Sequence, residues 1–287
     1  MALNLKDIRR RIRSTRSMQQ IFKAMEMVSA AKLRRAQQRA QAASPYSAKI
    51  SEMLANLSGA AAELEHPLFK VREVRRTALV VITADRGFAG TYNSTILRQA
   101  EARLHEAAPG EVQLVVVGRK GRDYLRRRRY PILAAHADLP GEASLEFARL
   151  LTDDLTARFL SGEVDRVELL YTHFVNAIVR RVRHETFLPV GSADAKQSGG
   201  ADSGMIFEPD AETIFAALLP RYATAKLYAA LADSLASEHS ARMVAMGSAR
   251  KNAGELVDTL TLLRNRLRQA AITREISELV GGAEALK

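Results

Sequence analysis

Residues 255–283 read ELVDTLTLLRNRLRQAAITREISELVGGA, and they end a helix-forming run that starts at Glu208. Acidic residues with Pro209 at the start of this run, and Gly281-Gly282 near its end, are typical helix start and stop signals. A helix of this length would extend roughly 110 Å at its rise per residue. Its apolar residues alternate at spacings of four and three, the pattern of a coiled coil, at Leu256, Leu260, Leu263, Leu267 and Ala270. Such a narrow apolar stripe requires a second long helix beside it.

The other end of the chain provides a matching helix. The same spacing runs from Leu3 to about Leu57, at Leu5, Ile8, Ile12, Thr15, Gln19, Phe22, Glu26, Ser29, Leu33, Ala36, Ala40 and Ala43. Pro45 should kink or end this helix near Ser44, and Pro220 could open a second segment of the C-terminal helix. We therefore predict an antiparallel coiled coil formed by the two termini, with the middle of the chain folded separately.

A second apolar stripe lies beside the first on the N-terminal helix, at Met18, Ile21, Met25 and Val28. One interpretation is a surface for a partner that comes and goes, since flexible methionine side chains suit a contact that re-forms. The other interpretation is that the stripe facing the C-terminal helix is simply broad. The pattern alone does not distinguish them.

The middle of the chain has the pattern of a small doubly wound α/β domain. Short runs rich in β-branched residues predict buried parallel strands at 77–84, 112–118, 132–136 and 166–174, and 178–190 alternates as an edge strand does. Helical segments at 93–107, 119–129 and 143–160 separate the strands. Residues 191–204 are rich in Gly, Ser and Asp, as flexible links are.

The predicted fold class is therefore α/β with a long antiparallel α-helical coiled coil. We assign residues 1–57 to the N-terminal coiled-coil helix and 70–190 to the α/β domain. Residues 191–206 form the linker, and 207–287 form the C-terminal coiled-coil helix.

Composition narrows the kinds of chemistry. The chain has no cysteine, which excludes disulfides and thiol catalysis, and its six histidines lack the spacing of metal ligands. No apolar run is long enough to span a membrane and the N-terminus lacks a secretion signal, so we expect a cytosolic or peripheral protein.

The positive charge is concentrated at one end of the chain. Residues 1–57 contain twelve Lys and Arg against three Asp and Glu, a net charge of +9 of the chain's +11. This excess favours an acidic partner, which could be phosphate, an anionic membrane or a carboxylate-rich protein surface. A solvated helix face would give the same charge pattern.

A doubly wound domain raises the possibility of nucleotide binding. Neither G-x-G-x-x-G nor G-x-x-x-x-G-K-[ST] is present, and the nearest stretches are DRGFAG at 85–90 and GRKG at 118–121. Glycines after strands commonly serve only the turn, so we predict no cofactor and no catalytic residue. The RRRR run at 126–129 could contact nucleic acid, but such runs more often end a solvated helix.

Four stretches together resemble the gamma subunit of rotary (F-type) ATP synthases: residues 8–37, 82–96, 236–256 and 271–283. Their order and separation also fit, so the resemblance covers the whole chain. The last stretch is the most specific, with Ile272-Thr273, Glu275, Glu278 and Gly282-Ala283 arranged as in the family's signature. Ala89 departs from the pattern, because many relatives have Cys there. No cysteine-bearing insertion is present, so thiol switching through this chain is excluded.

The resemblance implies a central rotor stalk without catalytic activity of its own. In this family one copy turns inside a ring of three alpha and three beta subunits, and the α/β domain lies near the epsilon subunit and the c-subunit ring. The stalk couples transmembrane ion flow to ATP synthesis or hydrolysis, and it regulates ATPase activity and ion flow. The resemblance thus implies a peripheral position on the cytoplasmic side of the inner membrane, with no metal, cofactor or nucleic acid.

The resemblance also implies two sets of contact residues. Those that meet the beta subunits match Lys23, Met25, Arg34, Arg35, Glu238, Arg242, Arg268, Gln269, Thr273 and Glu275. Those that form an apolar bearing at the tip match Ile276, Leu279 and Val280.

Two other functions compete with the rotor stalk. A basic coiled-coil adaptor would bind nucleic acid or an anionic membrane with an affinity that falls log-linearly with salt. An independent nucleotide-dependent enzyme would show turnover by the purified chain alone.

Overall fold

The computed structural model describes residues 4–60, 66–138, 141–190 and 211–284. The linker predicted at 191–206 lies outside these ranges. The chain divides into two compact units, one formed by residues 1–29 with 242–287 and the other by residues 30–241. Helices α1 (Leu5–Ala60) and α5 (Ala211–Glu284) each contribute to both units.

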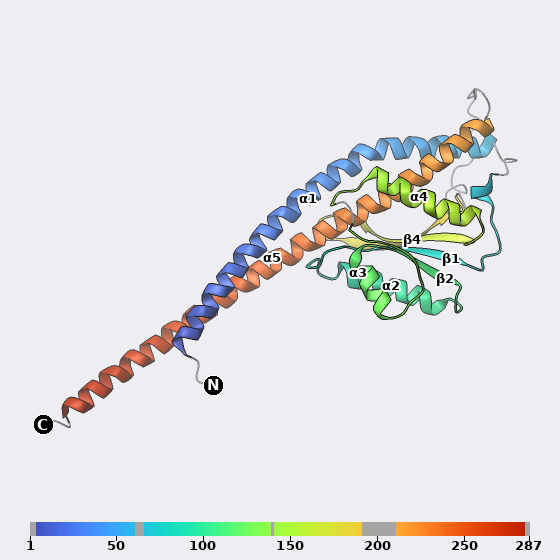
Figure 1. Ribbon diagram of the computed structural model, residues 1–287. Coiled ribbons are helices and arrows are strands. Elements are labelled where there is room, and N and C mark those ends of the chain that lie inside the picture. Colours follow the sequence, from blue (N-terminus) through green and yellow to red (C-terminus); the bar gives the residue numbers. More distant parts are fainter. Residues whose placement is uncertain (1–3, 61–65, 139–140, 191–210, 285–287) are drawn as a thin grey trace. The chain divides into compact units, whose positions relative to one another are not determined.

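The second unit contains a five-stranded sheet with the order β3-β2-β1-β4-β5 (Figure 1). Its strands are β1 (Thr77–Ile82), β2 (Val112–Val117), β3 (Ile132–His136), β4 (Arg166–Phe174) and β5 (Arg180–Leu188). The first four are parallel, and β5 pairs antiparallel with β4. The sheet order reverses between β1 and β4, which confirms the predicted doubly wound topology.

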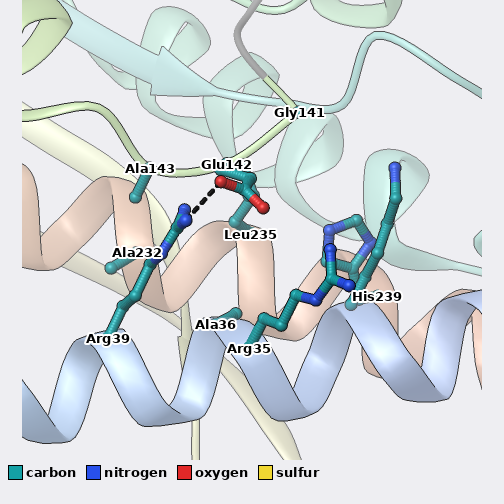
Figure 2. A pocket seen from close by; sticks show the side chains of 10 residues that line it. Arg35, Ala36, Arg39, Gly141, Glu142, Ala143, Ala232, Leu235 and His239 are labelled. Atoms are coloured by element: carbon teal, nitrogen blue, oxygen red, sulfur yellow. Dashed lines mark ion pairs between the residues drawn. The ribbon is translucent and has the colours of Figure 1, made fainter.

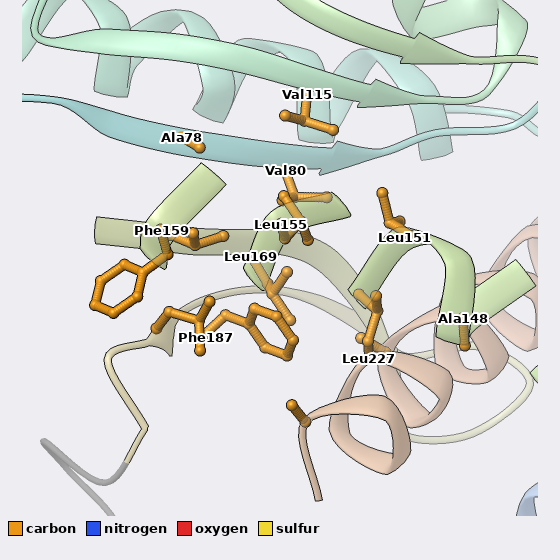
Figure 3. Close-up of a cluster of buried hydrophobic side chains, with 14 of the residues drawn as sticks. Ala78, Val80, Val115, Ala148, Leu151, Leu155, Phe159, Leu169, Phe187 and Leu227 are labelled. Atoms are coloured by element: carbon orange, nitrogen blue, oxygen red, sulfur yellow. The ribbon is translucent and has the colours of Figure 1, made fainter. Parts of the chain in front are cut away.

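Helices cover both faces of this sheet. On one face, α2 (Tyr92–Glu106) and α3 (Arg119–Arg127) enclose a core that includes Leu79, Ile96 and Leu125. On the other face lie the short 3₁₀ helix η1 (Pro67–Phe69), α4 (Leu145–Leu160) and part of α5. Figure 3 shows Leu155 and Leu227 among the side chains that pack against this second face. The strands are therefore buried on both sides, as their continuous apolar runs predicted.

Two prolines lie within helices that continue past them. The structure continues α1 through position 45, so the prediction that the first helix could end near Ser44 is wrong. Pro220 lies inside α5, which excludes a second helical segment opening there. A proline removes one backbone donor, and the buried neighbours Leu219 and Ala223 anchor α5 to the core on both sides of that position.

A tight contact joins the turns that follow β1 and β2. Gly118 has a φ of +101°, and a Cβ atom there would overlap the carbonyl oxygen of Thr83. The Thr83 hydroxyl donates to the Val117 carbonyl at 2.9 Å and accepts from the Gly121 amide at 2.9 Å. These glycines thus let two backbone segments approach each other.

We expect Gly118→Ala to destabilise the second unit by several kcal/mol, on the order of 3, because the new methyl group meets backbone that cannot move aside. Gly110→Ala is the matched control, since Gly110 also has a positive φ, +84°, but nothing lies within 4 Å of its Cβ position. It should cost about 1 kcal/mol. Urea unfolding monitored by limited proteolysis would measure both, and equal losses would contradict the steric explanation.

Candidate functional site

The unit formed by residues 1–29 and 242–287 is an antiparallel pair of helical segments (Figure 1). Ile8, Ile12 and Val257 are buried between the segments, with Leu260, Leu263 and Leu267 packed against them. Every predicted stripe position from Leu5 to Ala36 is buried or half-buried. Ala40 and Ala43 lie outside the residues whose side chains are described.

The C-terminal half of this stripe differs from the prediction by one position. Leu256 is 48 % exposed, whereas Val257 is 7 % exposed. The small residues Ala253 and Gly254 face the partner segment one turn earlier. A close approach at these residues turns Val257 rather than Leu256 inward. Ala270 is also exposed, which corrects its assignment to the stripe.

Two polar stripe residues are accommodated by glycines on the opposite segment. A Cβ atom on Gly254 would lie 2.9 Å from the Gln19 side-chain nitrogen, and one on Gly247 would lie 3.2 Å from a Glu26 carboxylate oxygen. Arg250 donates to Glu26 at 2.9 Å. The spacing placed Gln19 and Glu26 in the stripe but did not identify the groups that face them. The spacing could have indicated these contacts. Gln19 and Glu26 are seven residues apart, as are Gly247 and Gly254, and seven residues make two helical turns.

The outer face of the N-terminal segment exposes apolar side chains. Met18, Ile21, Met27 and Val28 are exposed, and Met25 is half-buried. Most of the second apolar stripe therefore does not face the C-terminal segment. Lys23 is exposed among these residues, so the surface combines apolar and cationic groups.

The last turns of α5 are exposed on all sides. From Arg268 to Ala283 every residue is exposed, including Gln269, Thr273, Glu275 and Ile276. Leu279 is 74 % exposed and Val280 is 56 % exposed. The structure thus brings together on one helix end the predicted contact residues of this region and the predicted tip.

The remaining predicted contact residues differ in their exposure to solvent. Arg34 and Arg35 are exposed on α1, whereas Glu238 is half-buried and Arg242 is buried on α5. Arg242 is therefore less available to a partner than the sequence suggested.

The carboxyl edge of the sheet is where a nucleotide would bind in a doubly wound domain. Here the Asp85 carboxylate accepts from the Arg119 amide at 2.7 Å and from the Asp138 amide at 3.3 Å. Arg119 also pairs with the Asp138 carboxylate. An internal carboxylate therefore occupies the helix N-terminus at which a phosphate group would be bound.

Two carboxylates of the second unit, Glu168 and Asp233, are paired across its elements. Glu168 on β4 accepts from His184 Nε2 at 2.8 Å and from Arg103 Nε at 3.2 Å. Burial alone would raise the pKa of Glu168, but the hydrogen bonds from His184 and Arg103 outweigh it and lower the pKa to about 2. His173 Nδ1 lies 2.5 Å from Asp233 Oδ2, and burial raises the pKa of Asp233 against the opposing effect of this hydrogen bond. These pairs tie helices to the sheet.

Within the described ranges, no group of three or more His, Cys, Asp or Glu side chains is arranged to hold a metal ion. No helix in the same ranges has a segment that is both long and apolar enough to cross a membrane.

The sequence matches to known proteins extend along nearly the entire chain. The family model described as ATP synthase matches residues 4–286. The ATP synthase gamma chain of Moorella thermoacetica is 46 % identical over 284 residues, 99 % of each chain. That of Symbiobacterium thermophilum is 45 % identical over 292 residues and covers all of both chains.

Two solved structures share the fold. The central stalk and c-ring structure of Tetrahymena thermophila mitochondrial ATP synthase contains a chain that is 27 % identical, with a TM-score of 0.63. The match covers 80 % of this protein and 99 % of that chain. A chain of the Euglena gracilis mitochondrial ATP synthase in rotational state 3 is 19 % identical with a TM-score of 0.72, over 98 % and 94 % of the two chains. Together with the sequence matches, these findings show that the chain belongs to the ATP synthase gamma chain family.

Proposed function

We propose that this chain is the central rotor stalk of a rotary ATP synthase and that it has no catalytic activity of its own. The observation that carries the proposal is the helical pair of residues 1–29 and 242–287. Its inner stripe is filled within the chain, while Met18, Ile21 and Val28 remain exposed on its outside. A surface of this kind supports contact with surrounding subunits. The relatives give no support to a nucleic-acid or membrane adaptor.

The stalk acts by contacting different conformations of its neighbours with different energies. A helical pair has no threefold symmetry, so neighbours arranged around it meet different side chains at any moment. Rotation then changes which conformation each neighbour favours, which is a population shift driven by mechanical work. In this way ion flow is coupled to ATP synthesis or hydrolysis, and the stalk regulates ATPase activity and ion flow.

The basic N-terminal segment provides one contact with the beta subunits. Lys23 and Arg34 are exposed and Met25 is half-buried, so cationic and apolar groups are both available to an acidic segment of a partner. Toward the C-terminal end of α5, polar side chains contact the beta subunits: Arg268, Gln269, Thr273 and Glu275. Glu238 and Arg242, which are more buried, support the helix that carries these contacts.

The tip of α5 serves as an apolar bearing. Ile276, Leu279 and Val280 are exposed and belong to consecutive turns. Apolar side chains form no directional hydrogen bonds, so a matching apolar sleeve formed by the alpha and beta subunits would hold the tip while it turns.

The remaining partners are the epsilon subunit and the c-subunit ring, close to the α/β domain. One copy of the chain is present in each complex, which lies peripherally on the cytoplasmic side of the inner membrane. The membrane is reached through the c-subunit ring.

A reversible cross-link tests the proposal. Because the chain has no cysteine, Lys23→Cys can be paired with one cysteine in the facing acidic segment of a beta subunit in an otherwise cysteine-free complex. We expect ATP hydrolysis by the complex to stop on oxidation and to return on reduction, since the stalk can no longer turn.

An internal cross-link is the matched control. Gln19→Cys and Gly254→Cys lie on facing segments of the same helical pair, and a short bifunctional maleimide would join them. These two segments turn together, so hydrolysis should continue after this link forms. Continued hydrolysis with the Lys23 link closed would reject the rotor function as placed here.

A further inference from the structure

A small pocket in the unit of residues 30–241 collects positive charge (Figure 2). It lies between α1, the loop that precedes α4, and α5. Its lining comprises Lys32, Arg35, Ala36, Arg39, Gly141, Glu142, Ala143, Ala232, Leu235 and His239.

Three cationic side chains come from one face of α1. Lys32, Arg35 and Arg39 are separated by three and four residues, which places them on the same side of the helix. Glu142 is the one carboxylate in the lining, and it pairs with Arg39 (Figure 2). Across the described residues, neither Lys32 nor Arg35 forms an ion pair. The lining therefore has two more positive than negative charges when His239 is neutral.

The floor of the pocket, beside these charges, is mostly apolar. Ala36, Ala232 and Leu235 are apolar, and His239 is only 5 % exposed. On the opposite side the loop approaches closely, since a Cβ atom on Gly141 would lie 3.8 Å from Lys32 Nζ. Like charges repel more strongly beside such a surface than in bulk water. A bound anion would relieve this repulsion.

We propose that this pocket binds a small oxyanion of the phosphate or sulfate class between the Lys32 ammonium and the Arg35 guanidinium. Ammonium and guanidinium groups donate several charge-assisted hydrogen bonds to such an anion. The lining has no aromatic ring besides His239, so it offers little for a nucleobase to stack on. The ligand is therefore an inorganic oxyanion and not a nucleotide.

The pocket separates the roles of two adjacent arginines. Arg34 is exposed and does not line the pocket, so it remains available to a protein partner. Arg35 faces the pocket and serves the oxyanion. The inference does not depend on the rotor function, since the site lies entirely within residues 30–241.

Lysine acylation in the assembled complex tests the site. A limiting amount of an N-hydroxysuccinimide ester is applied in inorganic phosphate or in chloride of equal ionic strength, and mass spectrometry measures the rate at each lysine. We expect phosphate to slow acylation of Lys32 several-fold. Lys251, whose side chain is 78 % exposed, should react at the same rate in both salts.

Two variants make the test specific. Arg35→Gln should abolish the protection of Lys32 by phosphate. Glu142→Gln should strengthen it, because the substitution removes the competing carboxylate and releases Arg39 to the anion. The second variant tests the proposal even if the first impairs assembly.

Several outcomes would overturn the proposal. Lys32 could react equally in phosphate and chloride, or Lys251 could be protected to the same extent, which would indicate general ion effects. Lys32 could also be fully protected without phosphate, which would mean that a carboxylate of a partner subunit occupies the pocket. That last result would reject the oxyanion and leave the rotor function intact.

Discussion

Replacing Ile8 with aspartate is expected to separate the helical segments 1–29 and 242–287. Ile8 is fully buried, and among the residues that the structure describes its cluster contains two other buried apolar side chains, Ile12 and Val257. Removing a buried aliphatic side chain costs about 2–5 kcal/mol, and an unpaired carboxylate in its place adds to that cost. Because so few apolar side chains are buried between the two segments, the remaining ones do not compensate for such a loss of stability.

Hydrogen exchange measured by mass spectrometry would follow the separation. Peptides from both segments should lose protection in Ile8→Asp, although the substitution lies on one of them. Arg9→Asp is the control, because it places the same carboxylate on the exposed side of the same turn. If residues 242–267 kept their protection in Ile8→Asp, the pairing described here would not be what stabilises them.

Replacing Glu168 with alanine should produce the second large effect, this time in the α/β domain. Arg103, with a side chain 19 % exposed, would lose the nearer of its two carboxylate partners and keep only Glu111, at 3.9 Å. His184 would lose the same acceptor. Breaking a buried ion pair by removing one partner typically costs about 3–5 kcal/mol. Limited proteolysis in increasing urea would measure this loss. Glu73→Ala breaks an ion pair whose side chains are both more than 75 % exposed, and it should cost less than about 1 kcal/mol.

The same carboxylate predicts a pH dependence. Its pKa is lowered from 4.5 to about 2 in the folded state, so the unfolded chain takes up the proton first as the pH falls. The stabilisation, about 3 kcal/mol for a shift of this size, is present above pH 4.5 and is lost as the pH falls toward 2. The difference in stability between the wild type and Glu168→Gln should therefore be constant near neutral pH and shrink in this window. A difference that stayed constant down to pH 2 would contradict the pairing.

The sequence predicted the α/β domain well because its strands are buried on both faces. Continuous apolar runs such as LVVI and LVVV arise where helices cover both sides of a parallel sheet, and few other arrangements produce them. The third and fourth strands were predicted with the bounds that the structure shows, Ile132–His136 and Arg166–Phe174.

The helical pair was predicted less completely, for two physical reasons. The stripe on the N-terminal segment is correct because Ile8, Ile12 and Leu33 have no apolar neighbours in sequence that could replace them. On the other segment Leu256 and Val257 are adjacent, and the choice between them depends on the close approach at Ala253 and Gly254. Spacing within one helix does not contain that information.

The predicted contact residues show the same limit. Lys23 is exposed because it lies off the buried stripe, and the tip residues are exposed because they lie beyond the end of the stripe. The position of Arg35 in a pocket depends on the loop at 141–143 and on α5, which lie far from it in the sequence. Only the folded unit brings these groups together.

Observation of single complexes tests the central claim most directly. With the catalytic ring fixed to a surface, a visible probe attached through Leu150→Cys, on the exposed side of α4, should turn in one direction while ATP is hydrolysed. It should stop when the Lys23 cross-link is closed. ATP hydrolysis at the ordinary rate while the probe stays stationary would contradict the proposal that the chain is a rotating stalk.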